Sequence, residues 1–172
     1  MADHNSDKHS SESGVETRSA VNYPILLTGN CRRAIVVGGG KVATRKIRAL
    51  LAAGIEVEII APDITEELQD HAEAGDLHWH DVPYALDVVD LTKFDLLFAA
   101  TDVRTVNAAA AKDGRSARVL VNVADDPDAC DFFTPAALRN DSDGVIIAVS
   151  STTGNPTKAR DWKNRIKLLL GN

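Results

Sequence analysis

Two groups of residues in this 172-residue chain have the types and spacing that chemistry requires. The first lies in the run VGGGKVATRK, where Gly38, Gly40 and Ala43 form a G-x-G-x-x-A pattern. Glycines at a strand-to-helix turn let a pyrophosphate approach the unpaired N–H groups of the helix. The pattern therefore predicts a dinucleotide site, with a purely structural tight turn as the alternative.

The usual companion of such a turn is an acidic residue after the next strand, where it binds the ribose of the adenosine. That strand ends in IIAPD, so we expect Asp63, or the backbone around Pro62, to contact the ribose. No arginine follows to receive a 2′-phosphate, and this favours NAD over NADP.

The second group of polar residues closes two later strands. FAATDVRTVN carries Thr101 and Asp102, next to the nicotinamide half of a dinucleotide, and VNVADD carries Asn122 and Asp125. Ligands of parallel sheets bind at this carboxyl edge, although acidic residues there are commonly helix caps or solvated loop residues. These residues alone leave open whether the nucleotide would be a reactant or a signal.

The elements that must position these residues alternate in type. Apolar runs predict strands at 34–37, 57–63, 77–80, 94–102 and 118–126, and amphipathic stretches predict helices at 42–53, 64–76 and 104–114. This alternation is typical of an α/β protein with a Rossmann-type, doubly wound parallel sheet, here over residues 21–126.

The alternation ends at Pro127, so residues 127–172 are predicted to form a small C-terminal α+β element. In it we expect a strand, a short helix and a strand, followed by a helix over 157–170. At the other end, the apolar segment NYPILLTG at 22–29 could pair at a sheet edge.

Composition excludes several classes of protein. With 25 acidic and 19 basic residues the net charge is −6, which disfavours a general nucleic-acid binder. No stretch approaches the roughly 18 apolar residues of a membrane span. Residues 1–20 are polar and predict a disordered tail without a secretory signal, so we expect a cytoplasmic protein.

Two further features have mainly structural interpretations. Cys31 and Cys130 are far apart and are expected to be reduced thiols. His78 and His80 share one face of a strand, but no third ligand is near in the sequence, so no metal site is predicted.

Taken together, the motifs resemble the dehydrogenase and ferrochelatase module of sirohaem synthase. Members of that family carry VGGGxVAxRK, AATDD…VN, NVxDxPxxCDFxxPA and AxSSxGxSPxxAR segments, and the likeness extends from Asn22 to about Leu170. It implies an enzyme that oxidises precorrin-2 to sirohydrochlorin with NAD, and in some members also inserts Fe²⁺. A non-catalytic NAD-sensing module of the potassium-transport type is the alternative.

The resemblance also implies roles for particular residues. Asp125 matches the aspartate essential to the chemistry, and Asn122, Ser151 and Arg160 are expected near the tetrapyrrole. The contacts of the cofactor would be Gly38, Gly40, Lys41, Val42, Pro62 and Asp63, with Thr101 and Asp102 at the nicotinamide end. The apolar segments DFFTPAAL and GVIIAVS would form a homodimer interface.

This chain departs from the family pattern in two places. Thr152 and Thr153 stand where a glycine pair is usual, and Asn155 replaces the usual serine before proline. The chain also lacks the extra helical region of longer members, which favours the dehydrogenase interpretation over the ferrochelatase one.

Overall fold

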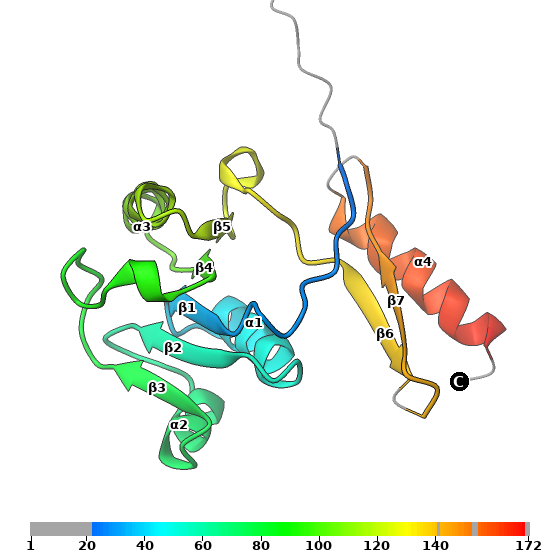
Figure 1. The fold of residues 1–172 in the computed structure, drawn as a ribbon, viewed down its shortest axis with the longest axis horizontal. Helices are drawn as coiled ribbons and strands as arrows, with labels where there is room; N and C mark the ends of the chain where they lie inside the picture. The colour runs from blue at the N-terminus through cyan, green and yellow to red at the C-terminus, as the bar shows by residue number, and fades with distance from the viewer. Residues whose placement is uncertain (1–21, 141, 153–154, 171–172) are drawn as a thin grey trace, which may run out of the picture.

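A computed structural model describes residues 22–140, 142–152 and 155–170 of the chain (Figure 1). Two units are visible: a parallel sheet with its helices, and a smaller unit of one hairpin and one helix. The predicted tail at 1–20 lies outside the described residues.

Five parallel strands form the larger sheet, in the order β3-β2-β1-β4-β5. Their bounds are Arg33–Val37 for β1, Glu56–Ile60 for β2, Leu77–His80 for β3, Leu96–Ala99 for β4 and Leu120–Val123 for β5. Three helices connect them: α1 at Lys41–Leu51, α2 at Glu66–Glu73 and α3 at Arg104–Ser116. The chain between β3 and β4 carries a short 3-10 turn, η1, at Leu91–Lys93. The predicted doubly wound α/β sheet is confirmed.

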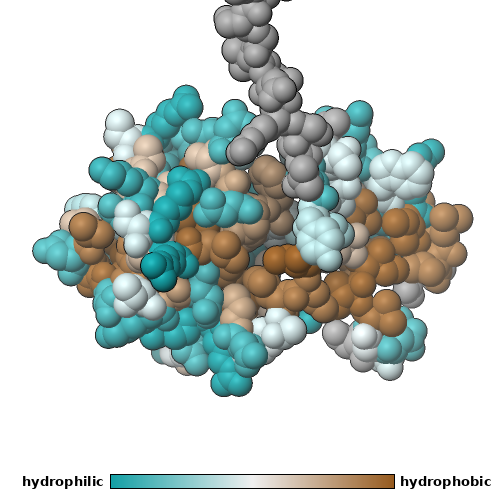
Figure 2. Space-filling view, turned by 45° about the horizontal axis from the view of Figure 1, so that its top comes forward, coloured by the Kyte–Doolittle hydropathy of each residue, from teal (hydrophilic) through white to brown (hydrophobic). Residues whose placement is uncertain are grey.

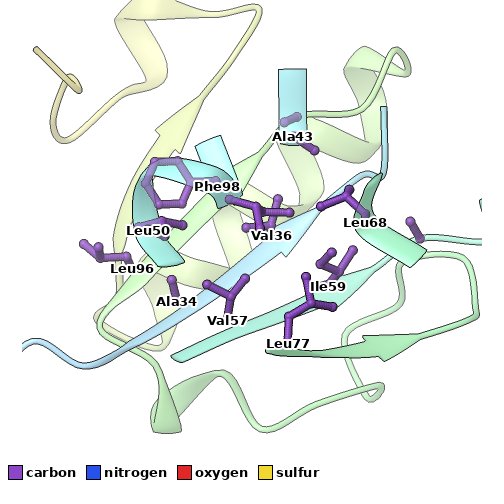
Figure 3. Packing of buried hydrophobic residues seen from close by; sticks show 13 residues of the cluster. Ala34, Val36, Ala43, Leu50, Val57, Ile59, Leu68, Leu77, Leu96 and Phe98 are labelled. Carbon is purple, nitrogen blue, oxygen red and sulfur yellow. The ribbon is translucent and has the colours of Figure 1, made fainter. Parts of the chain in front are cut away.

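The central strand is apolar throughout because both of its faces are covered. Ala34 and Val36 pack with residues of α1 and α2, and Figure 3 shows this cluster. The alternate residues Ile35 and Val37 pack with α3 on the opposite face. Since side chains alternate between the faces of a strand, the run AIVV supplies both cores.

The order in which successive strands join the sheet reverses at β1. Strands β2 and β3 extend to one side of it, and β4 and β5 extend to the other. Both β2 and β4 pair with β1 in parallel, so the loops after β1 and β4 emerge next to each other at the carboxyl edge. Such a switch point is where open α/β sheets bind ligands.

The smaller unit is a β-hairpin covered by a helix. Strand β6 at Ala136–Asn140 pairs antiparallel with β7 at Val145–Val149, and α4 at Pro156–Leu169 packs on both. The predicted short helix between these strands is wrong among the described residues there. A turn takes its place, in which Gly144 adopts φ +66 and Asn140 pairs with Ser142 and Asp143.

The N-terminal segment forms no strand, so the predicted edge strand at 22–29 is also wrong. Tyr23, Ile25 and Leu26 are exposed there. The segment instead reaches the smaller unit, where the Asn22 side-chain amide donates to the Thr152 carbonyl oxygen at 2.9 Å.

Apolar side chains gather on the surface of the smaller unit. Figure 2 shows a broad hydrophobic area over the part of the molecule that holds β6, β7 and α4. Its exposed members include Val145, Ile146, Trp162, Leu168 and Leu169. A contiguous area of this kind is typical of a surface that another chain covers.

Candidate functional site

The glycine turn after β1 is shaped by its contact with the turn after β4. Gly38 adopts φ +111, and a Cβ there would lie 2.6 Å from the carbonyl oxygen of Ala100. The amide of Ala100 in turn donates to Val37 at 2.8 Å. Only glycine fits both the dihedral angle and the close approach, in agreement with the predicted tight turn.

The start of α1 fits an anion. Gly40 is its N-cap, no side chain caps the helix, and no acidic residue stands in the first turn. A Cβ at Gly40 would meet no atom within 4 Å, so the space above the backbone is open. Lys41 and Val42 are exposed there, whereas Ala43 is fully buried against the sheet. These residues fit the pyrophosphate of a dinucleotide.

The turn after β2 borders the same edge. Pro62 and Asp63 are exposed, and Thr65 donates its amide to the carbonyl oxygen of Gly39 at 3.1 Å. Beside them lies a hollow of about 260 Å³. It is lined by Lys41, Thr44, Arg45, Arg48, Thr65 and Glu67. Arg48 is paired with Glu67 at 2.7 Å, which leaves Lys41 and Arg45 as the other cations of this hollow.

The turn after β4 carries Thr101 and Asp102 and lies beside the glycine turn at the switch point. Asp102 is exposed and Thr101 is half-buried. The Thr101 hydroxyl donates to the side-chain oxygen of Asn107 at 2.7 Å, and the amide of Val103 donates to that hydroxyl at 3.2 Å. The loop is therefore held by a hydrogen bond within it and by one to α3.

Asp125 lies at the same edge, two residues beyond the end of β5, and is exposed. Its Oδ1 accepts a hydrogen bond from Asn107 Nδ2 at 2.8 Å. Asp125, Asn107 and Asp126 line a hollow of about 170 Å³ together with Arg104 and Arg115. Arg104 lies 3.6 Å from Asp126, so the neighbouring carboxylate has its own cation.

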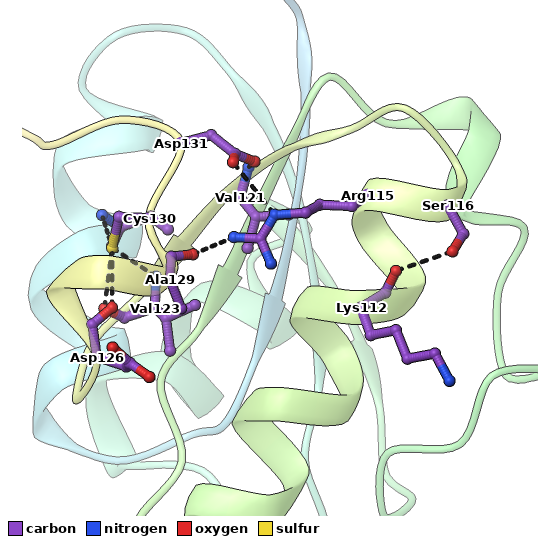
Figure 4. Close-up of polar contacts among 10 residues, drawn as sticks. Lys112, Arg115, Ser116, Val121, Val123, Asp126, Ala129, Cys130 and Asp131 are labelled. Carbon is purple, nitrogen blue, oxygen red and sulfur yellow. Dashed lines mark hydrogen bonds and ion pairs between the residues drawn. The ribbon is translucent and has the colours of Figure 1, made fainter. Parts of the chain in front are cut away.

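The loop after β5 is fastened to the strand by sulfur and carboxylate contacts (Figure 4). The Cys130 thiol accepts from the amide of Val123 at 3.1 Å and donates to its carbonyl oxygen at 3.2 Å. Asp131 accepts from the amide of Val121 at 2.9 Å and pairs with Arg115 at 3.2 Å. Burial raises the pKa of Cys130, so this thiol is a structural one.

Asn122 lies within β5, one residue before the carboxyl end of the strand, and its side chain is buried. It is 5% exposed, its Oδ1 accepts from Lys46 Nζ at 2.6 Å, and its Nδ2 donates to the Phe132 carbonyl oxygen at 2.9 Å. Lys46 lies over the ring of Phe98 at 5.1 Å, and burial, followed by the charge of Arg45, lowers its pKa. Asn122 thus connects β5 to α1 and to the segment that follows β5.

Ser151 and Arg160 lie on the smaller unit. Ser151 is half-buried after β7, and Arg160 is exposed on α4. Neither lines the two hollows beside the sheet edge. Of the atypical loop residues, Thr152 is described, whereas Thr153 lies outside the described residues.

The histidines of β3 have structural partners. His80 pairs with Glu58 at 2.8 Å, and the His78 ring packs against His80 at 4.5 Å. Within residues 22–140, 142–152 and 155–170 there is no group of three or more His, Cys, Asp or Glu residues able to hold a metal ion. In the same ranges no helix has the length and apolar character needed to span a bilayer. Both cysteines are free thiols.

Two residues at the carboxyl edge of the parallel sheet were not predicted to be site residues. Gly39 is the middle glycine, and only its place in the triplet marked it. Asn107 belongs to the quoted VN segment, but nothing in the sequence indicates that it reaches Asp125. Both depend on contacts between segments that are distant in the chain.

Comparisons with known proteins agree with this geometry. Residues 25–136 match a family described as "Putative NAD(P)-binding". "Siroheme synthase" of Chromobacterium violaceum is 39% identical over 148 residues, which is 86% of this chain and 31% of that protein. "Siroheme synthase 1" of Serratia proteamaculans is 35% identical over 147 residues, 86% of this chain and 30% of that protein. The chain therefore spans just under a third of these relatives.

A solved structure shares the fold. It is named "SirC, precorrin-2 dehydrogenase", and it superposes with a TM-score of 0.67 at 23% sequence identity. The match covers 84% of this chain and 69% of that one.

Proposed function

We propose that this chain, which belongs to the NAD(P)-binding family, is an NAD-dependent precorrin-2 dehydrogenase. In this reaction precorrin-2 is oxidised to sirohydrochlorin in sirohaem biosynthesis. The observation that carries the proposal is the exposed carboxylate of Asp125 at the sheet edge that also holds the glycine turn. The names of the sirohaem synthase relatives and of SirC support a tetrapyrrole substrate.

Asp125 is the proposed base. Oxidation of the macrocycle removes a hydride and a proton, and NAD⁺ supplies the acceptor of the hydride. Asn107 holds Oδ1 of Asp125 at 2.8 Å, so the second oxygen, Oδ2, is the atom placed to take the proton. Positioned proton transfer of this kind contributes roughly 10²- to 10⁴-fold to a rate.

The cofactor would lie along the carboxyl edge from β2 to β4. We assign the pyrophosphate to Gly38, Gly40 and the first turn of α1, with Lys41 and Val42. Pro62 and Asp63 would contact the adenosine ribose. Thr101 and Asp102 would border the nicotinamide.

We propose NAD rather than NADP as the cofactor. The turn after β2 presents the exposed carboxylate of Asp63 and no basic residue, which opposes a 2′-phosphate. Lys41 and Arg45 line the adjacent hollow and could attract one, so both cofactors belong in the test.

A homodimer is part of the proposal. The exposed apolar side chains of β7 and α4 would be covered by a partner chain. A partner also offers a way to bring Ser151 and Arg160 to a substrate beside Asp125, because neither residue lines the hollows of its own chain.

Insertion of Fe²⁺ into sirohydrochlorin is a second candidate activity. Metallation displaces two pyrrole protons, and the Asp125 carboxylate could accept them as it accepts the proton of the oxidation. The cytoplasmic location expected from the sequence stays a prediction.

The proposal is tested by an anaerobic optical assay. Precorrin-2 is mixed with protein and NAD⁺, or with NADP⁺ in parallel, and sirohydrochlorin and the reduced cofactor are followed. Fe²⁺ is added in a second step. Equimolar sirohydrochlorin and NADH support the dehydrogenase, whereas tight NAD binding without turnover would establish the sensing module instead.

A further inference from the structure

Asn107 is the one polar side chain on the buried face of α3. The other buried residues of this helix are Ala110, Ala111 and Gly114, and Asn107 itself is only 1% exposed. Asparagine is a weaker helix former than alanine, and a buried amide is costly unless it is hydrogen-bonded. An alanine or leucine would serve packing alone, so the amide points to another role.

The amide of Asn107 joins two loops of the sheet edge. Its Nδ2 donates to Asp125 Oδ1 at 2.8 Å and to the Thr101 carbonyl oxygen at 3.0 Å. Its Oδ1 accepts from the Thr101 amide at 3.0 Å and from the Thr101 hydroxyl at 2.7 Å. One side chain therefore connects the turn after β4 with the proposed base after β5.

The orientation of this amide is fixed. A backbone N–H can only donate, so the Asn107 atom that faces the Thr101 amide must be the oxygen. The nitrogen then faces Asp125, whose Oδ1 accepts the bond as an anion. Among the described residues nothing else hydrogen-bonds this carboxylate, so Asn107 alone determines which oxygen is engaged and which is presented.

We propose that Asn107 is a positioning residue. It holds Asp125 in place for proton transfer and connects it to Thr101 in the turn after β4. Its catalytic consequence rests on the proposed function, whereas the contact itself does not. The inference adds a residue outside the expected cofactor, substrate and catalytic sets.

Kinetics of two variants separate positioning from packing. Asn107→Ala removes the donor, and we expect kcat to fall roughly 10- to 100-fold, the effect of a lost hydrogen bond to a charged group. We expect the KM for NAD⁺ to rise by a smaller factor than kcat falls, because Asn107→Ala also releases Thr101, which would border only the nicotinamide end of the cofactor. Asn107→Asp keeps the volume but places a carboxylate against Asp125, so its kcat should fall at least as far.

A packing role predicts the opposite order, with the isosteric Asn107→Asp less harmful than Asn107→Ala. Tyr84→Phe is the matched control, because it removes a hydrogen bond to Asp113 near the other end of α3 and should leave kcat unchanged. Wild-type kcat in Asn107→Ala would overturn the proposal.

A spectroscopic test needs no turnover. In the cofactor-free protein the side-chain NH₂ resonances of Asn107 should move with pH as the carboxylate they contact gains a proton. The charged groups that line this hollow are Asp125, Asp126, Arg104 and Arg115. The movement should vanish in Asp125→Asn and persist in Asp126→Asn. Movement that survives in Asp125→Asn overturns the contact, even if an Asn107 variant fails to fold.

These two readouts distinguish the two proposals. If precorrin-2 is not oxidised but the resonances respond to Asp125, the proposed function fails and the contact remains. If oxidation proceeds but kcat is insensitive to Asn107, the dehydrogenase stands and the positioning role falls.

Discussion

The carbonyl oxygen of Asp63 occupies the place where a side chain at Gly39 would begin. A Cβ at Gly39 would overlap this oxygen and the side chain of Ile64, whereas one at Gly40 would meet no atom within 4 Å. The adjacent residues Gly39 and Gly40 are therefore required for different reasons. Gly39 lets the turns after β1 and β2 pack together, and Gly40 leaves room for a ligand.

Gly39→Ala should destabilise the fold. The added methyl has no space beside Asp63, and overpacking of this kind costs about 1–3 kcal/mol. The free energy of unfolding, measured by urea denaturation without cofactor, should fall by that amount. Unchanged stability would show that the two turns can separate freely.

Gly40→Ala should weaken cofactor binding without harming the fold. Its φ of −81 suits alanine, so the unfolding midpoint should not fall. The methyl enters the space that a pyrophosphate would use, and the Kd for NAD should rise at least about tenfold, as calorimetry would show. Equal affinity in this variant would place the cofactor elsewhere.

Asp125→Ala should slow the oxidation of precorrin-2 and leave cofactor binding intact. Loss of the base should lower kcat by roughly 10²- to 10⁴-fold, while the Kd for NAD stays within about twofold. Asp128→Ala is the matched control, because Asp128 is an exposed carboxylate of the same loop. A turnover rate that falls equally in both variants would assign the effect to loop charge.

The stability of the protein should decline in alkali because of Tyr84. Burial, with the hydrogen bond and charge of Asp113, raises the pKa of Tyr84 above its ordinary value of 10.0. The unfolded chain therefore loses this proton first, and the free energy of unfolding falls as pH rises above about 10. Tyr84→Phe should flatten this decline in urea titrations. Tyr23→Phe, which alters the exposed tyrosine, should not.

Ile146→Asp should convert a dimer to a monomer. Ile146 is 44% exposed on β7, within the apolar surface of the smaller unit. A buried carboxylate there would oppose association, and sedimentation velocity would report the change of mass. Leu86→Asp is the control, because Leu86 is also exposed but lies in the loop between β3 and β4. A wild type that sediments as a monomer would contradict the dimer itself.

The parallel sheet was predictable because most of its strands are short apolar runs that are followed by turn residues. The hairpin of the smaller unit was less so. Ala136, Ala137, Leu138 and Arg139 are good helix formers, yet they form β6, because pairing with β7 outweighs local propensity. The segment at 22–29 has strand-like composition, but none of the described strands pairs with it.

The edge residues were found by motif, and their contacts were not. Asp125 continues the row of Val121 and Val123, which faces α3, and so it meets Asn107. Asn122 belongs to the opposite row and meets Lys46 instead. This division follows from the period of two along a strand, once the structure shows which helix covers which face.

Because of the order of the strands, the substrate site is complete only after the last strand of the sheet, β5, has been synthesised and has paired. The glycine turn, the Thr101 turn and Asp125 become neighbours only after Val37 has paired with Ala99 and Ala99 with Val123. A nascent chain whose residue 123 is still inside the ribosome has the glycine turn and the Thr101 turn, but Asp125 is not yet beside them. The substrate should therefore stabilise only chains whose sheet is already whole, whereas the proposed cofactor contacts all precede β5.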